Sequence, residues 1–253
     1  MKFLKNFLEA LTIPVILLTI WSILTFTGLI PSYILPNPYE VLIAFYNLLI
    51  TGKLFIDATS TLLRVVTGFL IATAIAIPLG VGIGWSKTLE TLFNPIIQIL
   101  RPIPPLAWVP FALLWFGIGL KAEAFIIFIG SFFPILLNSL DAVKGVEKVL
   151  IEAACTLGAT ESQVLTKVVL PASSPGILLG LRVGFGIGFM CTVAAEMIAA
   201  KSGLGYLIME SMRLLDTGDV VVGMLTIGLI GFAIDYLLAK VEEKYIPWRG
   251  KTI

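Results

Sequence analysis

Residues 146–171 of the chain are VEKVLIEAACTLGATESQVLTKVVLP, a mixed polar and apolar stretch that lies between two long apolar ones. Apolar residues recur at helical spacing from Val146 to Leu157, and the charged residues lie off this stripe. Gly158 follows, in the position where a glycine commonly ends a helix. These features predict a short amphipathic helix that ends at a glycine turn.

A second short helix is predicted directly after the glycine. Thr160 and Gln163 match a capping box, in which each of the two side chains accepts a hydrogen bond from the other residue's backbone N–H. Pro171 is expected to stop this helix, because proline has no backbone N–H and its ring clashes with the preceding turn. The helix pair fills most of Asp141–Ser174, a loop of 34 residues. Loops of this length inside compact chains are usually functional.

Two roles for the helix pair remain open at this point: it rests on lipid headgroups, or it docks on another protein. Helices that bind lipid surfaces carry many lysines and arginines on their polar face. Here the acids outnumber the bases, with Asp141, Glu147, Glu152 and Glu161 against Lys144, Lys148 and Lys167. The first helix and the turn also present small residues, which suit close approach of another protein: Ala153, Ala154, Gly158 and Ala159. The composition favours docking.

The composition of the whole chain indicates an integral membrane protein. Of its 253 residues 58% are hydrophobic and 13% are charged, and the mean hydropathy is +1.02, whereas a soluble domain carries about 25% charged residues. A net charge of +1 argues against a nucleic-acid-binding protein. The absence of histidine removes the commonest metal ligand and general base, and Cys155 and Cys191 alone make no metal cluster. We expect neither a cofactor nor a metal, and the chain is not expected to be an enzyme.

Six membrane spans are predicted, because a helix needs about 20 mostly apolar residues to cross the hydrocarbon core. The third of them is interrupted by Arg101 and by several prolines. The predicted spans are Leu11–Ile30, a helix centred on Ile71–Ile83, Leu92–Leu120, Ala124–Leu140, the stretch from Pro175 to Glu196, and Val220–Lys240.

Six spans place both termini on one side of the membrane. With the termini in the cytoplasm, the inner segments hold twice as many lysines and arginines as the outer ones, so the positive-inside rule favours this orientation. Leu35–Pro38 is then outside and opens a short interfacial helix. Tight turns are predicted at Lys87–Glu90 inside and Gly117–Lys121 outside, and Lys201–Asp219 forms an outer loop.

The expected domain organisation follows from these spans. Residues 1–56 form an N-terminal span with an external segment, and 57–241 form the main transmembrane domain. The loop 141–174 belongs to that domain, and 242–253 is a cytoplasmic tail.

The long inner loop resembles the EAA loop of ABC importer permeases, whose pattern is E-A-A-x3-G-x9-I-x-L-P. The matching residues are Glu152, Ala153, Ala154, Gly158, Val168, Leu170 and Pro171, and the one departure is valine for the usual isoleucine at 168. Other stretches are similar to permeases of the nitrate, sulfonate and taurine branch, among them 101–108, 115–119, 194–197 and 202–206.

The resemblance implies an all-α, polytopic type I ABC importer permease in the cell membrane. It implies a permease dimer, here expected to be a homodimer, with two cytoplasmic ATPase subunits docked on the EAA loops. It also implies an external binding protein that delivers a small solute such as nitrate, a sulfonate or taurine. The chain carries no phosphate-binding loop of the form G-x4-G-K-[ST], so ATP is expected to be hydrolysed by the separate subunit.

A secondary transporter driven by an ion gradient is the alternative function. Such a transporter needs acidic residues near the bilayer midplane and often has an inverted repeat. The midplanes of the first, second, fourth and sixth spans carry no acid, and no convincing repeat is found.

Four glycines recur at a four-residue spacing in the fifth span: Gly176, Gly180, Gly184 and Gly188. Glycines at this interval form a groove in which another helix approaches closely. Two positions for this groove remain open, either against another helix of the same chain or near the centre of the dimer.

Candidate residues of the translocation path are Arg101, Pro104, Pro105 and Glu196. Irregular backbone such as the proline-rich part of the third span is tolerated at membrane depth only where it is buried in protein or lines a water-filled cavity. Arg101 either attracts an anion or extends to the inner headgroups. Glu196 is expected near the outer end of its span, facing water, while Arg182 is expected to extend to the headgroups and Asp235 to be structural.

Overall fold

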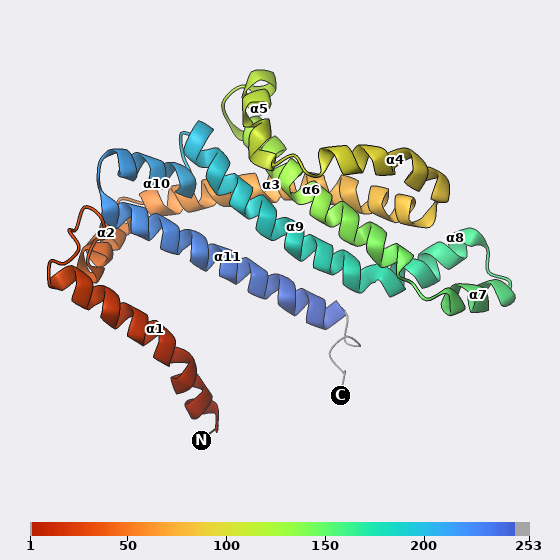
Figure 1. The fold of residues 1–253 in the computed structure, drawn as a ribbon, viewed down its shortest axis with the longest axis horizontal. Coiled ribbons are helices and arrows are strands. Elements are labelled where there is room, and N and C mark those ends of the chain that lie inside the picture. The colour runs from red at the N-terminus through yellow and green to blue at the C-terminus, as the bar shows by residue number, and fades with distance from the viewer. Residues whose placement is uncertain (1, 246–253) are drawn as a thin grey trace.

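A computed structural model describes residues 2–245 of the chain, and the side chains of 12–240 and 242–244. All regular elements among these residues are helical (Figure 1), so the all-α class is confirmed. In chain order they are α1 (Lys2–Phe26), α2 (Pro38–Ile50), α3 (Lys53–Trp85), α4 (Lys87–Leu100), η1 (Pro105–Trp108), α5 (Val109–Phe116), α6 (Leu120–Lys144), α7 (Lys148–Thr156), α8 (Glu161–Val164), the π-helical segment η2 (Leu165–Val169), α9 (Leu170–Ala199), α10 (Leu204–Arg213) and α11 (Thr217–Tyr245).

Four of the described helical stretches are long and apolar enough to cross a membrane: Lys53–Trp85, Leu120–Lys144, Glu161–Ala199 and Thr217–Lys244. They correspond to the predicted second, fourth, fifth and sixth spans. The predicted third span is a pair of helices, Lys87–Leu100 and Pro105–Phe116, bent by 85°, which counts as a fifth span if the pair is taken together. The predicted first span falls in α1, of which the part with described side chains is the shorter apolar helix Thr12–Phe26.

The third predicted span bends because its backbone cannot continue the helical hydrogen-bond ladder. Pro102, Pro104 and Pro105 have no N–H to donate, and Pro104 adopts an extended conformation with ψ of 135° just before η1. The two halves of the span therefore run in different directions on the side of α6.

The bundle is built on α3, α6 and α9, which lie side by side (Figure 1). Small residues bring the backbones of α3 and α6 together: Ala72 and Ala76 are fully buried, and a Cβ on Gly80 would lie 2.6 Å from the Leu136 carbonyl oxygen. In membranes such small residues let helices pack closely, since lipid supplies no hydrophobic force between them. Ile135 and Leu136 of α6 fill the apolar core between these helices.

The four-spaced glycines of α9 pack against α6 of the same chain. A Cβ on Gly180 would lie 2.7 Å from Asn138 Cβ, and one on Gly184 would lie 2.5 Å from Ile135 Cγ1. Gly176 lies against Ala142, and Gly188 against Ser131. The groove is therefore filled within one chain, which is the first of the two positions left open by the sequence.

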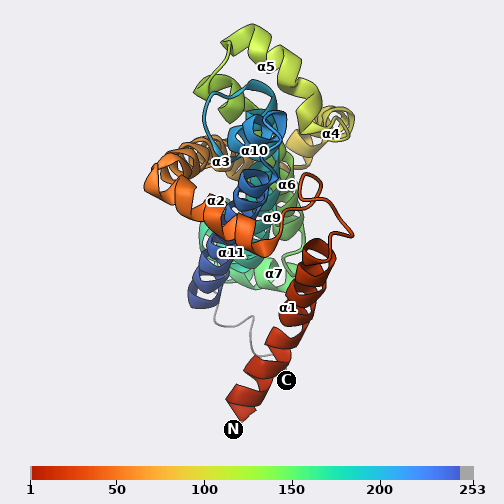
Figure 2. The same cartoon turned by 90° about the vertical axis from the view of Figure 1, so that its left-hand side faces the viewer.

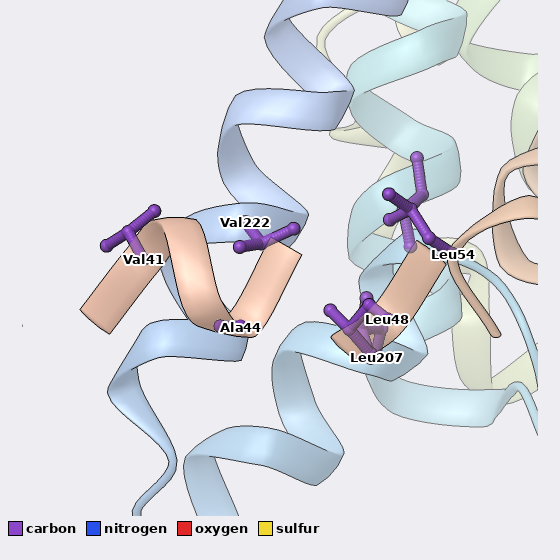
Figure 3. Packing of buried hydrophobic residues seen from close by; sticks show 7 residues of the cluster. Val41, Ala44, Leu48, Leu54, Leu207 and Val222 are labelled. Carbon is purple, nitrogen blue, oxygen red and sulfur yellow. The ribbon is translucent and has the colours of Figure 1, made fainter. Parts of the chain in front are cut away.

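The two ends of the bundle carry different elements. At one end α2 and α10 pack on the start of α11, while α7 and α8 lie at the opposite end (Figure 1). The predicted short helix after Leu35–Pro38 is α2, which is capped by a reciprocal Asn37–Glu40 box. Its apolar face is buried on α10 and α11 through seven clustered residues, six of them labelled in Figure 3: Val41, Ala44, Leu48, Leu54, Leu204, Leu207 and Val222.

Helix α1 lies beside the bundle rather than within it, as Figures 1 and 2 both show. Trp21 joins it to the start of α2, since its indole Nε1 donates a hydrogen bond to the Pro36 carbonyl at 2.9 Å.

Of the two tight turns predicted between spans, one is wrong and one is confirmed. The Lys87–Glu90 turn is absent, because α4 already begins at Lys87 and only Ser86 separates it from α3. The Ser86 hydroxyl accepts from the Leu89 N–H at 3.4 Å, which caps the new helix and makes a longer turn unnecessary. The Gly117–Lys121 turn is confirmed at Gly117 and Gly119, which have φ of +70° and +131°.

Pro171 does not stop the second short helix. The helix continues from Glu161 to Ala199 through the π-helical segment Leu165–Val169. A π-turn widens the helix by one residue, so the missing N–H and the ring of Pro171 are accommodated where a regular α-helical turn would clash. The inner segment is therefore shorter than predicted, because α6 extends to Lys144 and α9 begins at Leu170.

We predict that Gly184→Leu destabilises the folded chain, whereas Gly186→Leu does not. The added side chain at 184 meets Ile135 and the Ser131 carbonyl, while nothing lies within 4 Å of a Cβ at 186. Overpacking of this kind costs about 1–3 kcal/mol. Thermal unfolding of the detergent-purified variants measures the difference, and equal midpoints would contradict the packing described for α9.

Candidate functional site

The first candidate site is the helix pair α7–α8 at one end of the bundle. Helix α7 ends in a Schellman motif, in which the Gly158 N–H donates to the Cys155 carbonyl at 2.9 Å and the Ala159 N–H to the Ala154 carbonyl at 3.1 Å. Gly158 has φ of +82°, a conformation that glycine adopts at no steric cost. The predicted glycine cap is confirmed, and its geometry sets the angle at which the chain leaves α7.

The start of α8 is fixed by the predicted capping box. The Gln163 backbone N–H donates to Thr160 Oγ1 at 3.4 Å, and the Thr160 N–H donates to Gln163 Oε1 at 2.9 Å. Val164 and Val169 are buried with Val81 of α3 and Val143 of α6. The helix pair is thus anchored through its apolar stripe to the ends of two spans.

The opposite face of α7 is not covered by any described residue of the chain. Leu157 is 88% exposed and Val149 69% exposed, and Glu152, Ala153 and Cys155 are exposed beside them. An apolar surface at the polar end of a membrane protein indicates a site for a protein partner.

The sequence motif is divided between the exposed face and the anchor. Glu152, Ala153, Gly158 and Pro171 are exposed. Ala154, Val168 and Leu170 are half-buried, and Ala154 and Leu170 pack against the valine cluster.

The second candidate site is a cavity of about 460 Å³ between the bent α4–η1 pair, α6 and α9. Arg101 and Pro105 line it from the bend, and Asn138 and Asp141 line it from α6. The remaining lining is mostly apolar: Ile103, Ile129, Gly130, Phe133, Pro134, Leu137, Val183 and Ile187. The irregular backbone at the bend therefore borders a hollow, as the sequence analysis requires of such backbone at membrane depth.

The four residues proposed for a path are not brought together. Arg101 and Pro105 line the cavity, and Pro104 is the exposed residue just before η1. Glu196 lies near the other end of α9 and is only 1% exposed, so the expectation that it faces water is wrong.

Glu196 belongs to a buried polar cluster centred on Arg64. The Arg64 guanidinium donates from Nη1 to Glu196 Oε1 at 2.8 Å and pairs through Nε with Glu123. The Thr61 hydroxyl and the Gly205 N–H each donate to Glu196 Oε2 at 2.9 Å. A buried ion pair is tolerated only when further hydrogen bonds satisfy its charges, and this carboxylate has them.

The same cluster holds the connection between α9 and α10. Arg64 donates from Nη1 to the Ser202 carbonyl and from Nη2 to the Ser202 hydroxyl, both at 2.9 Å. The Gly203 N–H donates to Asp57 Oδ1 at 2.8 Å. Five elements meet at this point, namely α3, α6, α9, the 200–203 connection and the start of α10.

Sequence reasoning missed Arg64, Glu123 and Asp57, which it placed in outer segments or left unassigned. A signal was present in the spacing of Asp57, Thr61 and Arg64, which follow one another at helical intervals on an apolar helix. The partners Glu123 and Glu196 are too distant in the sequence to be matched by pattern.

Further ion pairs join helices nearer the surface, and two of them involve residues named above or the end of the bundle that carries α10. Arg182 of α9 pairs with Asp235 of α11 at 2.5 and 2.7 Å, so Asp235 is confirmed as structural and Arg182 has a protein partner. At the end that carries α10, the Lys53 ammonium donates to Glu210 at 2.7 Å, and this hydrogen bond lowers the pKa of the Glu210 carboxyl.

None of these groups forms a catalytic arrangement. Among the residues that the structure describes, no group of three or more Asp, Glu and Cys side chains is arranged to hold a metal ion. The described sites are an exposed apolar surface on α7, the cavity at the bend with one guanidinium and one carboxylate, and the buried polar cluster around Arg64, which we call the clamp.

The sequence matches a known family. Residues 72–246 match the model described as "Binding-protein-dependent transport system inner membrane component". A putative ABC transporter permease protein of Methanocaldococcus jannaschii is 48% identical over 97% of this chain and 93% of its own length.

Several relatives are named after the solute that they transport, among them a taurine permease and a nitrate permease. The taurine transport system permease protein of Escherichia coli K12 is 38% identical over 94% of this chain and 88% of its own. The nitrate import permease protein of Synechocystis is 32% identical over 93% of this chain and 88% of its own.

The fold is similar to that of a chain in a solved inward-facing structure of the MetNI methionine ABC transporter. The TM-score is 0.70 at 20% sequence identity, and the match covers 78% of this chain and 97% of that one. At this identity the likeness concerns the fold alone.

We predict that Arg64→Met strongly destabilises the folded chain. Removing the guanidinium leaves Glu123 and Glu196 buried without a counter-ion, which costs about 3–5 kcal/mol. Lys53→Met is the matched control, because it breaks an ion pair from the same helix whose side chains are 42% and 34% exposed, a kind worth at most about 1 kcal/mol. Denaturant or thermal unfolding measures both, and equal losses would refute the clamp.

Proposed function

The chain belongs to the binding-protein-dependent transport system inner membrane component family, and on this premise we propose that it forms the solute path of an ATP-driven importer in the cell membrane. Members of the family are multi-pass, non-catalytic permease subunits of ABC transporters, and their ATPase is a separate subunit. They work with ATPase subunits and with a binding protein.

The observation that carries the proposal is the exposed face of α7. Glu152 and Ala153 of the motif lie there beside exposed Leu157, on a helix whose exit angle is fixed by Gly158. The buried valines behind it connect the helix pair to α3 and α6. A partner that docks on α7 and moves can therefore move the spans, which is what ATP-driven transport requires.

We assign all the motif residues to one ATPase-coupling segment, which runs from α7 through α8 to Pro171: Glu152, Ala153, Ala154, Gly158, Val168, Leu170 and Pro171. The end with α7 and α8 then faces the cytoplasm together with both chain termini, and the end with α2 and α10 faces outward, where the binding protein delivers solute. Two copies of the chain form a homodimer around the path.

The path is proposed to pass the cavity at the α4–η1 bend. Arg101 and Pro105 line this cavity, and Pro104 belongs to the same bend. Glu196 does not line this cavity. Its role in the permease is to hold the α9–α10 connection at the outward end, where its carboxylate accepts a hydrogen bond from the Gly205 N–H. Taurine and nitrate, which the relatives carry according to their names, are small solutes with an anionic group, and the Arg101 guanidinium suits such a group.

The domain limits of 1–56, 57–241 and 242–253 also remain proposals. The family model begins at residue 72, inside α3. In the proposed tail, 242–245 belong to α11 and 246–253 lie outside the described residues.

The two native cysteines test the orientation and the docking surface. Cys155 is exposed on α7 and Cys191 is buried in α9. A membrane-impermeant thiol reagent should label inside-out vesicles but not right-side-out cells, and Cys155→Ser should abolish the labelling while Cys191→Ser leaves it intact. Adding the ATPase subunit should protect Cys155. Labelling from the external side would overturn the orientation, and unprotected labelling from the cytoplasmic side would overturn docking at α7.

We predict that Gly158→Val uncouples transport from the ATPase. Valine at φ of +82° is strained, so the variant shifts the exit from α7 and lowers both the protection of Cys155 and ATP-driven uptake into proteoliposomes that contain the binding protein, by about tenfold or more. Gly52→Val is the matched control, since Gly52 also has a positive φ, +72°, but lies between α2 and α3. Equal losses in the two variants would mean that strain alone, and not the coupling segment, is responsible.

A further inference from the structure

The cavity at the α4–η1 bend contains two opposite charges that are not paired. Arg101 lines one wall and Asp141 lines the other, from α6. Among the described residues no side chain forms an ion pair or hydrogen bond with either of them, and they form none with each other. A guanidinium and a carboxylate that share a hollow without meeting are available to a ligand.

Asn138 adds a second acceptor next to the carboxylate. Its Nδ2 donates one N–H to the Pro134 carbonyl at 2.8 Å, which fixes the amide and leaves Oδ1 free to accept, beside the second N–H. Asn138 and Asp141 are three residues apart on α6, so they lie on one face of the helix. The α6 wall therefore offers oxygen acceptors, and the bend offers guanidinium donors.

The rest of the lining is mostly apolar. Ile103, Phe133 and Val183 are apolar and offer no side-chain hydrogen bond. A simple anion in the cavity would be attracted by Arg101 but repelled by Asp141. A simple cation would be attracted by Asp141 but repelled by Arg101. A solute with both charges, held apart by a short apolar linker, satisfies both walls.

We propose that this cavity is a solute site for small zwitterions, with a sulfonate or carboxylate on Arg101 and a primary ammonium on Asp141 and Asn138. The proposal rests on the proposed function and names its solute class. A planar guanidinium binds carboxylate and sulfonate oxygens with two parallel hydrogen bonds, and an ammonium matches a carboxylate and an amide oxygen. The volume of about 460 Å³ is ample for such a small molecule.

Three probes separate the two charges: taurine, ethanesulfonate, which lacks the amine, and ethylamine, which lacks the sulfonate. Saturation-transfer NMR on the permease–ATPase complex in nanodiscs measures their binding without the binding protein. The intact chain should bind taurine at least tenfold more tightly than either of the other two, a difference of about 1.4 kcal/mol.

The variants assign each charge to its wall. Asp141→Asn should lower taurine affinity about tenfold, to the level of ethanesulfonate, without weakening ethanesulfonate itself. Arg101→Gln should weaken taurine and ethanesulfonate together, and Arg101→Lys should restore part of both. Asp216 lies in the turn between α10 and α11, away from the cavity. Asp216→Asn is therefore the control, and it should leave the affinities for all three probes unchanged.

Equal binding of taurine and ethanesulfonate to the intact chain, or an unchanged ratio in Asp141→Asn, would overturn the zwitterion site. This failure is distinct from failure of the proposed function. A chain that protects Cys155 with the ATPase but shows no taurine preference is a coupled permease for another solute. A chain that prefers taurine but gives no protection has the solute site without ATPase docking.

Discussion

The arrangement of this membrane protein depends on one guanidinium. Arg64 is placed on an apolar helix and pairs with Glu123 of α6 and Glu196 of α9. Because an isolated charge is expensive in a low-dielectric interior, these three helices must meet at this point for any of the three residues to be buried. The close glycine and alanine contacts between α3, α6 and α9 bring the backbones near enough for the side chains to reach one another. Charge pairing and small-residue packing thus reinforce each other.

The functional features differ in how firmly the surrounding structure holds them. The clamp lies toward the end that carries α10, and the cavity with Arg101 lies beside the proline-rich bend, where the backbone is irregular. The coupling segment is anchored by one apolar cluster, without ion pairs to the described residues, and presents apolar residues outward. A permease needs both a firmly held region and a loosely held one, because one end must respond to a partner while the spans keep their pairing.

Features encoded locally were predictable from the sequence, and features that depend on distant partners were not. Gly158 and the Thr160–Gln163 box follow from residues within one turn of each other, and both are found as predicted. The pairing of Arg64 with Glu196 joins residues 132 positions apart, and no periodicity reports it. Pro171 was misjudged for a related reason, since proline alone indicates a stop and only the π-helical segment before it allows the helix to continue. Asp141 was assigned to a loop, but α6 extends past it and places it in the cavity.

The uninterrupted helix from Glu161 to Ala199 has a mechanical consequence. Its 39 residues include part of the coupling segment at one end and Glu196 near the other, and its axis turns between α8 and α9 at the π-helical segment (Figure 1). The clamp on Glu196 and the valines around Val164 attach this helix to the bundle near its two ends, and the glycines of α9 attach it to α6 between them. Because the helical backbone continues through this turn, a displacement of α8 is passed on to α9, which borders the cavity through Val183 and Ile187. Had Pro171 broken the helix, the two ends would be hinged, and the same push would be absorbed at the joint.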